Sequence, residues 1–265
     1  MANWTEIDRY AKSWITEAGK SIRASFKQSL NIQTKSNPND LVTNMDKEIE
    51  KYFISNIRST YPDHSILGEE GNGDQLSSLN GIVWIIDPID GTMNFIHQQR
   101  NFVISIGIYE DGVGRLGYIY DVTHDELYFA EKGKGAYMNE VRLPPLEKFP
   151  VHQSLIAVNA TWLVKNAYFD QRKLAALAMA VRGTRSYGSA ALELAYVASG
   201  RLNSYLTMRL SPWDFAAGKI IVEEVGGVVT TLLGEELDML SVNSVFAGEA
   251  TLHSEILGKF LLHEE

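Results

Sequence analysis

One short segment, residues 81–86 (Gly-Ile-Val-Trp-Ile-Ile), constrains the fold of this 265-residue chain more than any other. Its bulky apolar residues follow one another without the polar–apolar alternation of a half-exposed strand, so we expect a fully buried strand. Two carboxylates, Asp87 and Asp90, follow it three residues apart. A buried strand that ends in this way aims both carboxylates at one point.

The predicted elements around this strand form two groups. Helical spacing of apolar residues predicts helices over residues 5–26 and from residue 43 to just before residue 61. Strands are predicted at residues 65–68, 82–86, 102–109, 116–121 and 127–131, with Asp111-Gly112 as a hairpin turn. Later strands are predicted near residues 155–158, 203–207, 228–232 and 242–246, and helices near 170–182, 190–199, 212–225 and 252–262.

This order of elements predicts two layered halves that share one interface. Pro144 and Pro145 lie in polar sequence, and we place the boundary near residues 140–152. The expected halves are residues 1–145 and 146–265.

Composition excludes several classes of protein. The chain has 24 basic and 33 acidic residues, a formal net charge of −9, whereas a nucleic-acid binder normally shows a basic face. The absence of Cys excludes disulfides, thiolate nucleophiles and sulfur-ligated metals. The longest apolar run, residues 174–181, is too short for a membrane span, and the N-terminal residues lack a secretory profile. We therefore expect a cytoplasmic protein that binds neither membrane nor nucleic acid.

The segment Asp87-Pro88-Ile89-Asp90-Gly91-Thr92 is the most informative of three acidic clusters. Two carboxylates so close repel each other unless one is protonated or a cation lies between them. Ligands that are all oxygen atoms point to Mg²⁺ or Mn²⁺. The same residue types are also common in simple turns.

The other two clusters also have structural explanations. Glu69-Glu70 follows a predicted strand and is equally typical of a solvated loop edge. Asp214 ends Ser211-Pro212-Trp213-Asp214, which has the Ser-x-x-acid pattern of a helix capping box. Asp46 stands in the same relation to Thr43. Capping and chemistry are compatible at both positions.

Four motifs in order resemble the inositol monophosphatase family of Mg²⁺-dependent, lithium-sensitive phosphatases. Residues 87–95 match the family's Asp-Pro-Ile/Leu-Asp-Gly-Ser/Thr-x-Asn-Phe pattern, and residues 213–218 match Trp-Asp-x-Ala-Ala-Gly. Residues 35–46 resemble the family's loop before the second helix, and residues 66–70 resemble its Gly-Glu-Glu segment. The resemblance covers roughly residues 5–260, and four ordered motifs are far more specific than one.

The resemblance implies a fold and a set of roles. The fold would be an α+β layered αβαβα sandwich, and the assembly a homodimer. Two or three Mg²⁺ ions, with Mn²⁺ as a substitute, would be bound by Glu69, Asp87, the carbonyl of Ile89, Asp90 and Asp214. Thr92, hydrogen-bonded to Asp46, would orient and help deprotonate the attacking water, with Glu69 also in a catalytic role. The implied substrate contacts are Asp90, Gly91, Thr92, Gly188, Ser189, Ala190, Thr207 and Asp214.

Phosphate ester chemistry agrees with this set of residues. Hydrolysis of a phosphate monoester needs acceleration of up to about 10²¹-fold, and the ester is already dianionic. Two neighbouring cations screen the ester, activate water and stabilise the leaving alkoxide. We therefore expect direct attack by water, with no phosphoenzyme.

The substrate is less constrained. Inositol 1-phosphate is the first expectation, but Thr207 stands where inositol-specific members often have Glu, and Arg100 stands where the family usually has Pro. Arg100 or Arg209 is either a solvated surface charge or a contact for a second phosphate, as in NADP(H) or fructose 1,6-bisphosphate. The motif pattern disfavours 3′-phosphoadenosine 5′-phosphate. A regulatory role through a protein partner is the alternative outside catalysis.

Overall fold

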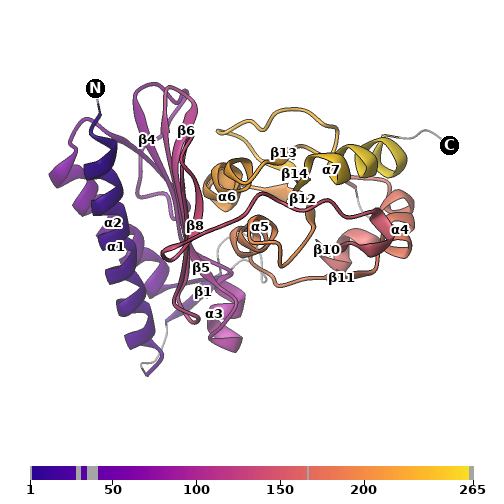
Figure 1. Ribbon diagram of the computed structural model, residues 1–265. Coiled ribbons are helices and arrows are strands. Elements are labelled where there is room, and N and C mark those ends of the chain that lie inside the picture. Colours follow the sequence, from indigo (N-terminus) through magenta and orange to yellow (C-terminus); the bar gives the residue numbers. More distant parts are fainter. Residues whose placement is uncertain (1, 28–30, 35–40, 166, 263–265) are drawn as a thin grey trace.

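The computed structural model describes residues 2–27, 31–34, 41–165 and 167–262, and its elements form five layers (Figure 1). Helices α1 (Trp4–Ser25) and α2 (Asn44–Thr60) cover the outer face of a first sheet. Helices α5 (Ala190–Ala198) and α6 (Pro212–Glu224) lie between that sheet and a second one. Helices α4 (Gln171–Ala180) and α7 (Ala250–Ile256) cover the far face of the second sheet. The expected α+β, αβαβα sandwich is confirmed.

The first sheet has seven strands in sequence order, β3 to β9. Only β3 and β4 pair in parallel, and each later strand is antiparallel to the one before. The strands are β3 (Ser65–Gly68), β4 (Ile82–Asp90), β5 (Val103–Glu110), β6 (Val113–Asp121), β7 (Glu126–Glu131), β8 (Gly135–Met138) and β9 (Val141–Arg142). The β5–β6 connection is the predicted Asp111-Gly112 hairpin, with φ of 50° and 79° at its two residues.

The second sheet has five strands in the order β11-β10-β12-β14-β13. Strand β10 is parallel to both of its neighbours, and β14 is antiparallel to both of its own. The strands are β10 (Leu155–Val158), β11 (Gly183–Arg185), β12 (Ser204–Leu210), β13 (Gly227–Thr230) and β14 (Asn243–Glu249). The remaining elements are the antiparallel pair β1 (Ile32–Thr34) and β2 (Leu41–Thr43) and helix α3 (Thr92–Gln98). There are also two short 3₁₀ helices, η1 (Val151–Gln153) and η2 (Ala160–Leu163), and a short π-helix, η3 (Leu257–Leu261).

The predicted buried strand is β4, which is covered on both faces. Val83 and Ile85 face α5 and α6, whereas Trp84 and Ile86 face α1 and α2, and all four side chains are fully buried. Burial on both faces explains why the segment shows no polar–apolar alternation. We expected the strand to end at residue 86, but it continues through the acidic residues to Asp90. Its pairing with β5 shifts register between Asp87 and Asp90, where Pro88 has no amide to donate.

The structure contains elements that the sequence pattern did not predict. Strands β1, β2, β8, β9 and β11 have only two to four residues each, and α3 has seven. Segments this short display at most about two periods of a helical or alternating pattern, so their signal in the sequence is weak. Residues 35–40 of the expected motif at residues 35–46 lie outside the described residues. The proposed boundary near residues 140–152 stays a prediction. Helices α5 and α6 from the second half pack against the first sheet, so the two halves share an interface.

Two glycines let α6 lie directly on the first sheet. Gly107 and Gly117 are directly opposite each other on β5 and β6. A Cβ atom on Gly107 would come within 2.9 Å of Ala216 Cβ, and one on Gly117 within 2.7 Å of the Ala217 carbonyl oxygen. The Tyr109 hydroxyl also donates to the Ala216 carbonyl at 2.9 Å. The position of α6 relative to the sheet is therefore fixed at backbone contact.

Gly117→Ala is expected to lower the free energy of unfolding by about 1–3 kcal/mol, because the added methyl group would overpack the contact between sheet and helix. Denaturant unfolding followed by circular dichroism measures this change. The matched control is Gly258→Ala, since a Cβ at Gly258 meets no atom within 4 Å. Equal midpoints for the two variants would contradict the proposed contact.

Candidate active site

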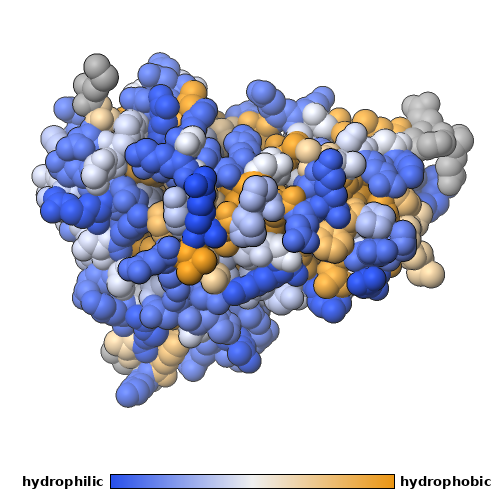
Figure 2. Space-filling view, in the orientation of Figure 1, coloured by the Kyte–Doolittle hydropathy of each residue, from blue (hydrophilic) through white to orange (hydrophobic). Residues whose placement is uncertain are grey.

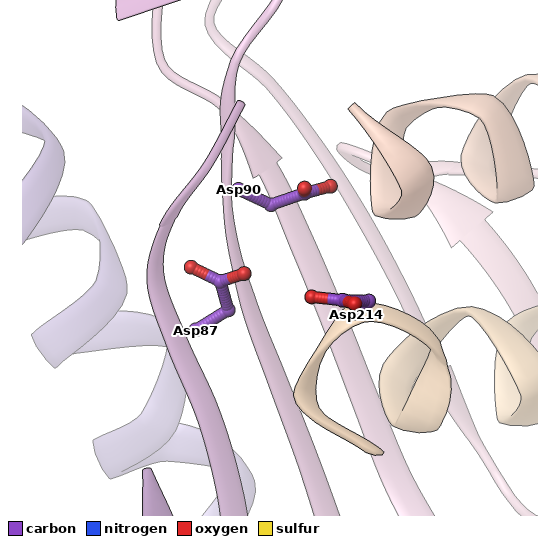
Figure 3. A group of neighbouring side chains, drawn as sticks. All are labelled: Asp87, Asp90 and Asp214. Carbon is purple, nitrogen blue, oxygen red and sulfur yellow. The ribbon is translucent and has the colours of Figure 1, made fainter. Parts of the chain in front are cut away.

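Three carboxylates from two layers of the fold converge on one point (Figure 3). Asp87 and Asp90 extend from the end of β4, and Asp214 extends from the first turn of α6. One oxygen of each lies within 4.8 Å of an oxygen of the others. The side chains of Asp87 and Asp90 are 1% and 8% exposed. The sequence motifs at residues 87–92 and 213–218 are thus brought together by the docking of α6 on the sheet.

Local hydrogen bonds hold each carboxylate in place. Asp214 accepts from the Ser211 amide at 2.8 Å, which completes the predicted capping box of α6. Asp87 accepts from the Ile89 amide at 2.9 Å. Asp90 accepts from the Ser189 hydroxyl at 2.7 Å and from the Ala191 amide at 2.6 Å, which links β4 to the start of α5. Capping and membership of the cluster therefore coexist in Asp214.

The carboxylates disfavour one another's charge. Burial, followed by the charges of Glu69, Asp90 and Asp214, raises the pKa of Asp87 well above its usual range. Burial also raises the pKa of Asp90 to about 6, although the hydrogen bonds from Ser189 and Ala191 lower it. Such a group requires protons or a cation, and its donors are all hard oxygen atoms. This donor set fits Mg²⁺.

Glu69 stands beside Asp87 because the chain turns sharply after β3. The Glu69 amide donates to the Ile86 carbonyl at 3.2 Å, so the segment follows β4 closely. Glu50, a fully buried residue of α2, accepts from the Glu70 amide at 2.8 Å and from the Asn72 side chain at 2.5 Å. We did not predict a role for Glu50. Its signal in the sequence is that Glu50, like Asp46, lies on the helix face that also carries Ile49 and Phe53.

Thr92 and Asp46 form a second part of the site. The Thr92 hydroxyl lies 3.1 Å from Asp46 Oδ1 and 3.1 Å from the Ile89 carbonyl oxygen, and can donate to either. The other oxygen of Asp46 accepts from the Thr43 amide at 2.8 Å and hydroxyl at 2.6 Å, which forms the capping box of α2. Burial raises the pKa of Asp46, and the hydrogen bonds from Thr43 and Thr92 oppose this rise. Asp46 therefore caps α2 and contacts Thr92 at once.

Gly91 allows α3 to begin close to the segment before α5. Its φ is +94°, and a Cβ there would lie 3.1 Å from Ser189 Cβ. Asn94 of α3 donates to the Tyr187 carbonyl at 2.6 Å and to the Asn101 carbonyl at 2.8 Å. Residues 91–94 and 187–190, almost a hundred positions apart, thus form one wall.

A cavity of about 250 Å³ adjoins the carboxylates. Of the predicted substrate contacts, those that line it are Asp90, Gly188, Ser189, Ala190, Thr207 and Asp214. Gly91 and Thr92 are not among its lining residues, and neither are Arg100 and Arg209, which are exposed. The lining residues that we did not predict are Asn159, Trp162, Ser186, Glu193, Tyr205 and Leu210.

Glu193 is the least expected of these lining residues. It is the only charged residue in the otherwise apolar helix α5, and this contrast in the sequence could have indicated a role for it. Its carboxylate accepts from the Tyr187 amide at 2.5 Å. Burial raises its pKa to about 7, against the hydrogen bonds from the Tyr187 and Gly188 amides. Glu193 therefore supports the wall that Gly188 and Ser189 form.

Comparisons with known proteins, by sequence and by fold, find relatives that span nearly the whole chain. The model of the inositol monophosphatase family matches residues 3–264. The inositol-1-monophosphatase of Bacillus subtilis (strain 168) is 60% identical over 261 residues, 98% of each chain. The crystal structure of SaIMPase-II with inositol monophosphate bound is 42% identical, with a TM-score of 0.87 over 97% of this chain and 93% of the other. An IMPase/NADP phosphatase complexed with Mg²⁺ and phosphate is 28% identical, with a TM-score of 0.89 over 97% and 95%.

The family match spans nearly the whole chain and includes both acidic motifs of the site. The predicted resemblance is confirmed. The chain belongs to the inositol monophosphatase family.

Proposed function

We propose that this chain is a Mg²⁺-dependent phosphate monoester hydrolase whose preferred substrate is inositol 1-phosphate. The convergence of Asp87, Asp90 and Asp214 beside a cavity is the observation that carries the proposal. The 60% identity to an inositol-1-monophosphatase supports the choice of substrate. The relative that contains Mg²⁺ and phosphate supports the choice of cofactor.

The proposed ligands of two or three Mg²⁺ ions are Glu69, Asp87, the carbonyl of Ile89, Asp90 and Asp214, with Mn²⁺ as a substitute. When bound, such ions screen the dianionic ester, lower the pKa of water and stabilise the leaving alkoxide. The hydrogen bonds from Ser189, Ala191 and Ser211 hold the carboxylates in position before any ligand enters. The chain thus supplies a preorganised acidic site.

Thr92, Asp46 and Glu69 have the proposed catalytic roles. When the Thr92 hydroxyl donates to Asp46, its oxygen is oriented to accept a hydrogen bond from the attacking water. Burial brings the pKa of Asp46 closer to neutrality, which favours its taking up a proton through Thr92. The amides of Gly91 and Thr92 are the proposed donors to the phosphate oxygens, since backbone donors need no basic side chain.

The lining of the cavity favours a substrate with a single phosphate. The described residues that line it include neither Lys nor Arg. A second phosphate would therefore enter a cavity that offers no cationic side chain to neutralise it. This favours inositol 1-phosphate over fructose 1,6-bisphosphate, and NADP(H) remains the second candidate because of the relative named as an IMPase/NADP phosphatase.

The homodimer and the cytoplasmic location belong to the same proposal. Figure 2 shows a largely hydrophilic surface over α1 and α2 and a more apolar one around α4. Val164, Tyr168 and Met179, on α4 or close to it in the sequence, are exposed apolar residues, and we propose that they take part in self-association. Among the described residues, no helix combines the length and the apolar character needed to cross a membrane.

Asp90→Asn is expected to lower Mg²⁺-dependent phosphate release from inositol 1-phosphate by about 100-fold or more, because a metal ligand is lost while one oxygen remains for the hydrogen bonds of Ser189 or Ala191. A phosphate-release assay on purified protein measures this. Asp63→Asn, at an exposed position, is the matched control and should keep wild-type turnover. Near-normal turnover of the Asp90→Asn variant would refute the metal assignment.

Removal of Mg²⁺ is expected to abolish the binding of inorganic phosphate. The carboxylates of Glu69, Asp87, Asp90 and Asp214 carry a combined charge of −4 when ionised, and this charge repels an anion unless cations compensate it. Calorimetric titration with phosphate, in excess chelator and after Mg²⁺ is restored, measures the effect. Phosphate binding that persists in excess chelator would contradict the proposed site.

A panel of four substrates at fixed Mg²⁺ tests specificity. We expect the highest kcat/KM for inositol 1-phosphate and lower values for NADP⁺, fructose 1,6-bisphosphate and 3′-phosphoadenosine 5′-phosphate, because each of these three carries further phosphate groups and the described lining residues supply no cationic side chain. A bisphosphate that ranks first would overturn the assignment of substrate. Failure of the purified protein to hydrolyse any of the four, with co-purification of a partner protein, would favour a regulatory role.

A further inference from the structure

Trp162 lies in the short helix η2, which follows strand β10 of the second sheet, and its side chain lines the cavity. Strand β10 runs parallel to β12, and Val158 at its end pairs with Leu206. The next residue, Asn159, caps η2 by accepting from the Thr161 amide at 3.0 Å. This register brings η2 beside the residue that follows Leu206 on β12, which is Thr207. Trp162 and Thr207 both line the cavity that also contains Asp90 and Asp214.

Several contacts fix the indole ring of Trp162. Its Nε1 atom donates to the Thr207 hydroxyl at 3.2 Å. The Tyr168 ring meets it edge-on, with centroids 5.7 Å apart and planes at 85°. The side chain also packs on the apolar cluster between the second sheet and its outer helices, which includes Leu206. A ring held in this way is a rigid surface that loses little entropy when a ligand packs against it.

The Thr207 hydroxyl is hydrogen-bonded within the protein. The side chain is 6% exposed, and its hydroxyl accepts from Trp162. The Thr207 hydroxyl therefore accepts the indole N–H, and this hydrogen bond orients the indole in the cavity wall.

We propose that Trp162 is a specificity-determining residue, which provides the wall against which a cyclic leaving group packs, and that Thr207 is a positioning residue for it. This inference rests on the proposed phosphatase function. The phosphate of any monoester would lie at the acidic end of the cavity, so Trp162 distinguishes substrates only by the alcohol part. The apolar C–H face of a ring covers the indole, whereas a short acyclic alcohol covers little of it and must also be ordered on binding.

The test compares two secondary monoesters with the same phosphate, inositol 1-phosphate and glycerol 2-phosphate, at saturating Mg²⁺. Trp162→Ala is expected to lower kcat/KM for inositol 1-phosphate by about 10-fold or more, mainly through KM. The value for glycerol 2-phosphate should stay within about 3-fold, since that substrate makes little contact with the ring. Trp162→Phe, which keeps an aromatic face, should restore most of the loss. Trp4→Ala removes a partly buried Trp of α1 and is the matched control.

Thr207→Val tests the positioning role. It should change the KM for inositol 1-phosphate in the same direction as Trp162→Ala, and it should add nothing in the Trp162→Ala background, because Thr207 acts through the indole. An additional loss in the double variant would mean that Thr207 contacts substrate directly, and would overturn this part of the proposal.

Two outcomes would overturn the role of Trp162: an equal loss for both substrates, or no loss for either. The first is what a merely structural role predicts, and thermal unfolding of each variant would show the accompanying destabilisation. Failure of the wild-type protein to hydrolyse either ester would refute the proposed function itself. The failure of the inference is therefore distinguishable from the failure of the function.

Discussion

The burial of β4 on both faces is the constraint on which the rest of the structure depends. Trp84 and Ile86 pack under α1 and α2, and Val83 and Ile85 pack under α5 and α6. A strand covered in this way has no solvent-exposed side, and its pairing is strongly specified because a slip of one residue would exchange the two apolar sets. The carboxylates at its end are consequently delivered to a fixed position. The function of the site begins with this packing.

Hydrogen bonds that belong to the fold also serve the site. Asp46 and Asp214 each complete a capping box, and Asp90 accepts from two groups at the start of α5. Capping interactions of this type contribute about 0.5–2 kcal/mol each. They offset part of the free energy that is required to bring several carboxylates together in a buried place. Stability and chemistry are therefore not separate properties of these three side chains.

The sequence indicated the three carboxylates that converge, but only six of the residues that line the cavity. Asp87, Asp90 and Asp214 were identifiable because short motifs with restricted backbone geometry surround each of them. Trp162 and Asn159 were not identifiable, because their place in the cavity depends on the register between β10 and β12, which no local pattern encodes. Glu50 and Glu193 lie between these cases, since each is a carboxylate on a mostly apolar helix face and its partners lie outside its own helix. Local motifs indicated the carboxylates of the site, whereas the pairing of distant strands was not predictable from the sequence.

The cluster in Figure 3 draws its carboxylates from β4 and from α6, two elements that the sequence separates by more than a hundred residues. A cation held by all three carboxylates can bind only a chain in which these elements are docked, so its binding free energy is added to the folding free energy. The chain has no cysteine and hence no covalent cross-link. Under the proposed metal assignment, the bound cation would act as a reversible, non-covalent cross-link between layers, and the conditions that load the site would also stabilise the fold.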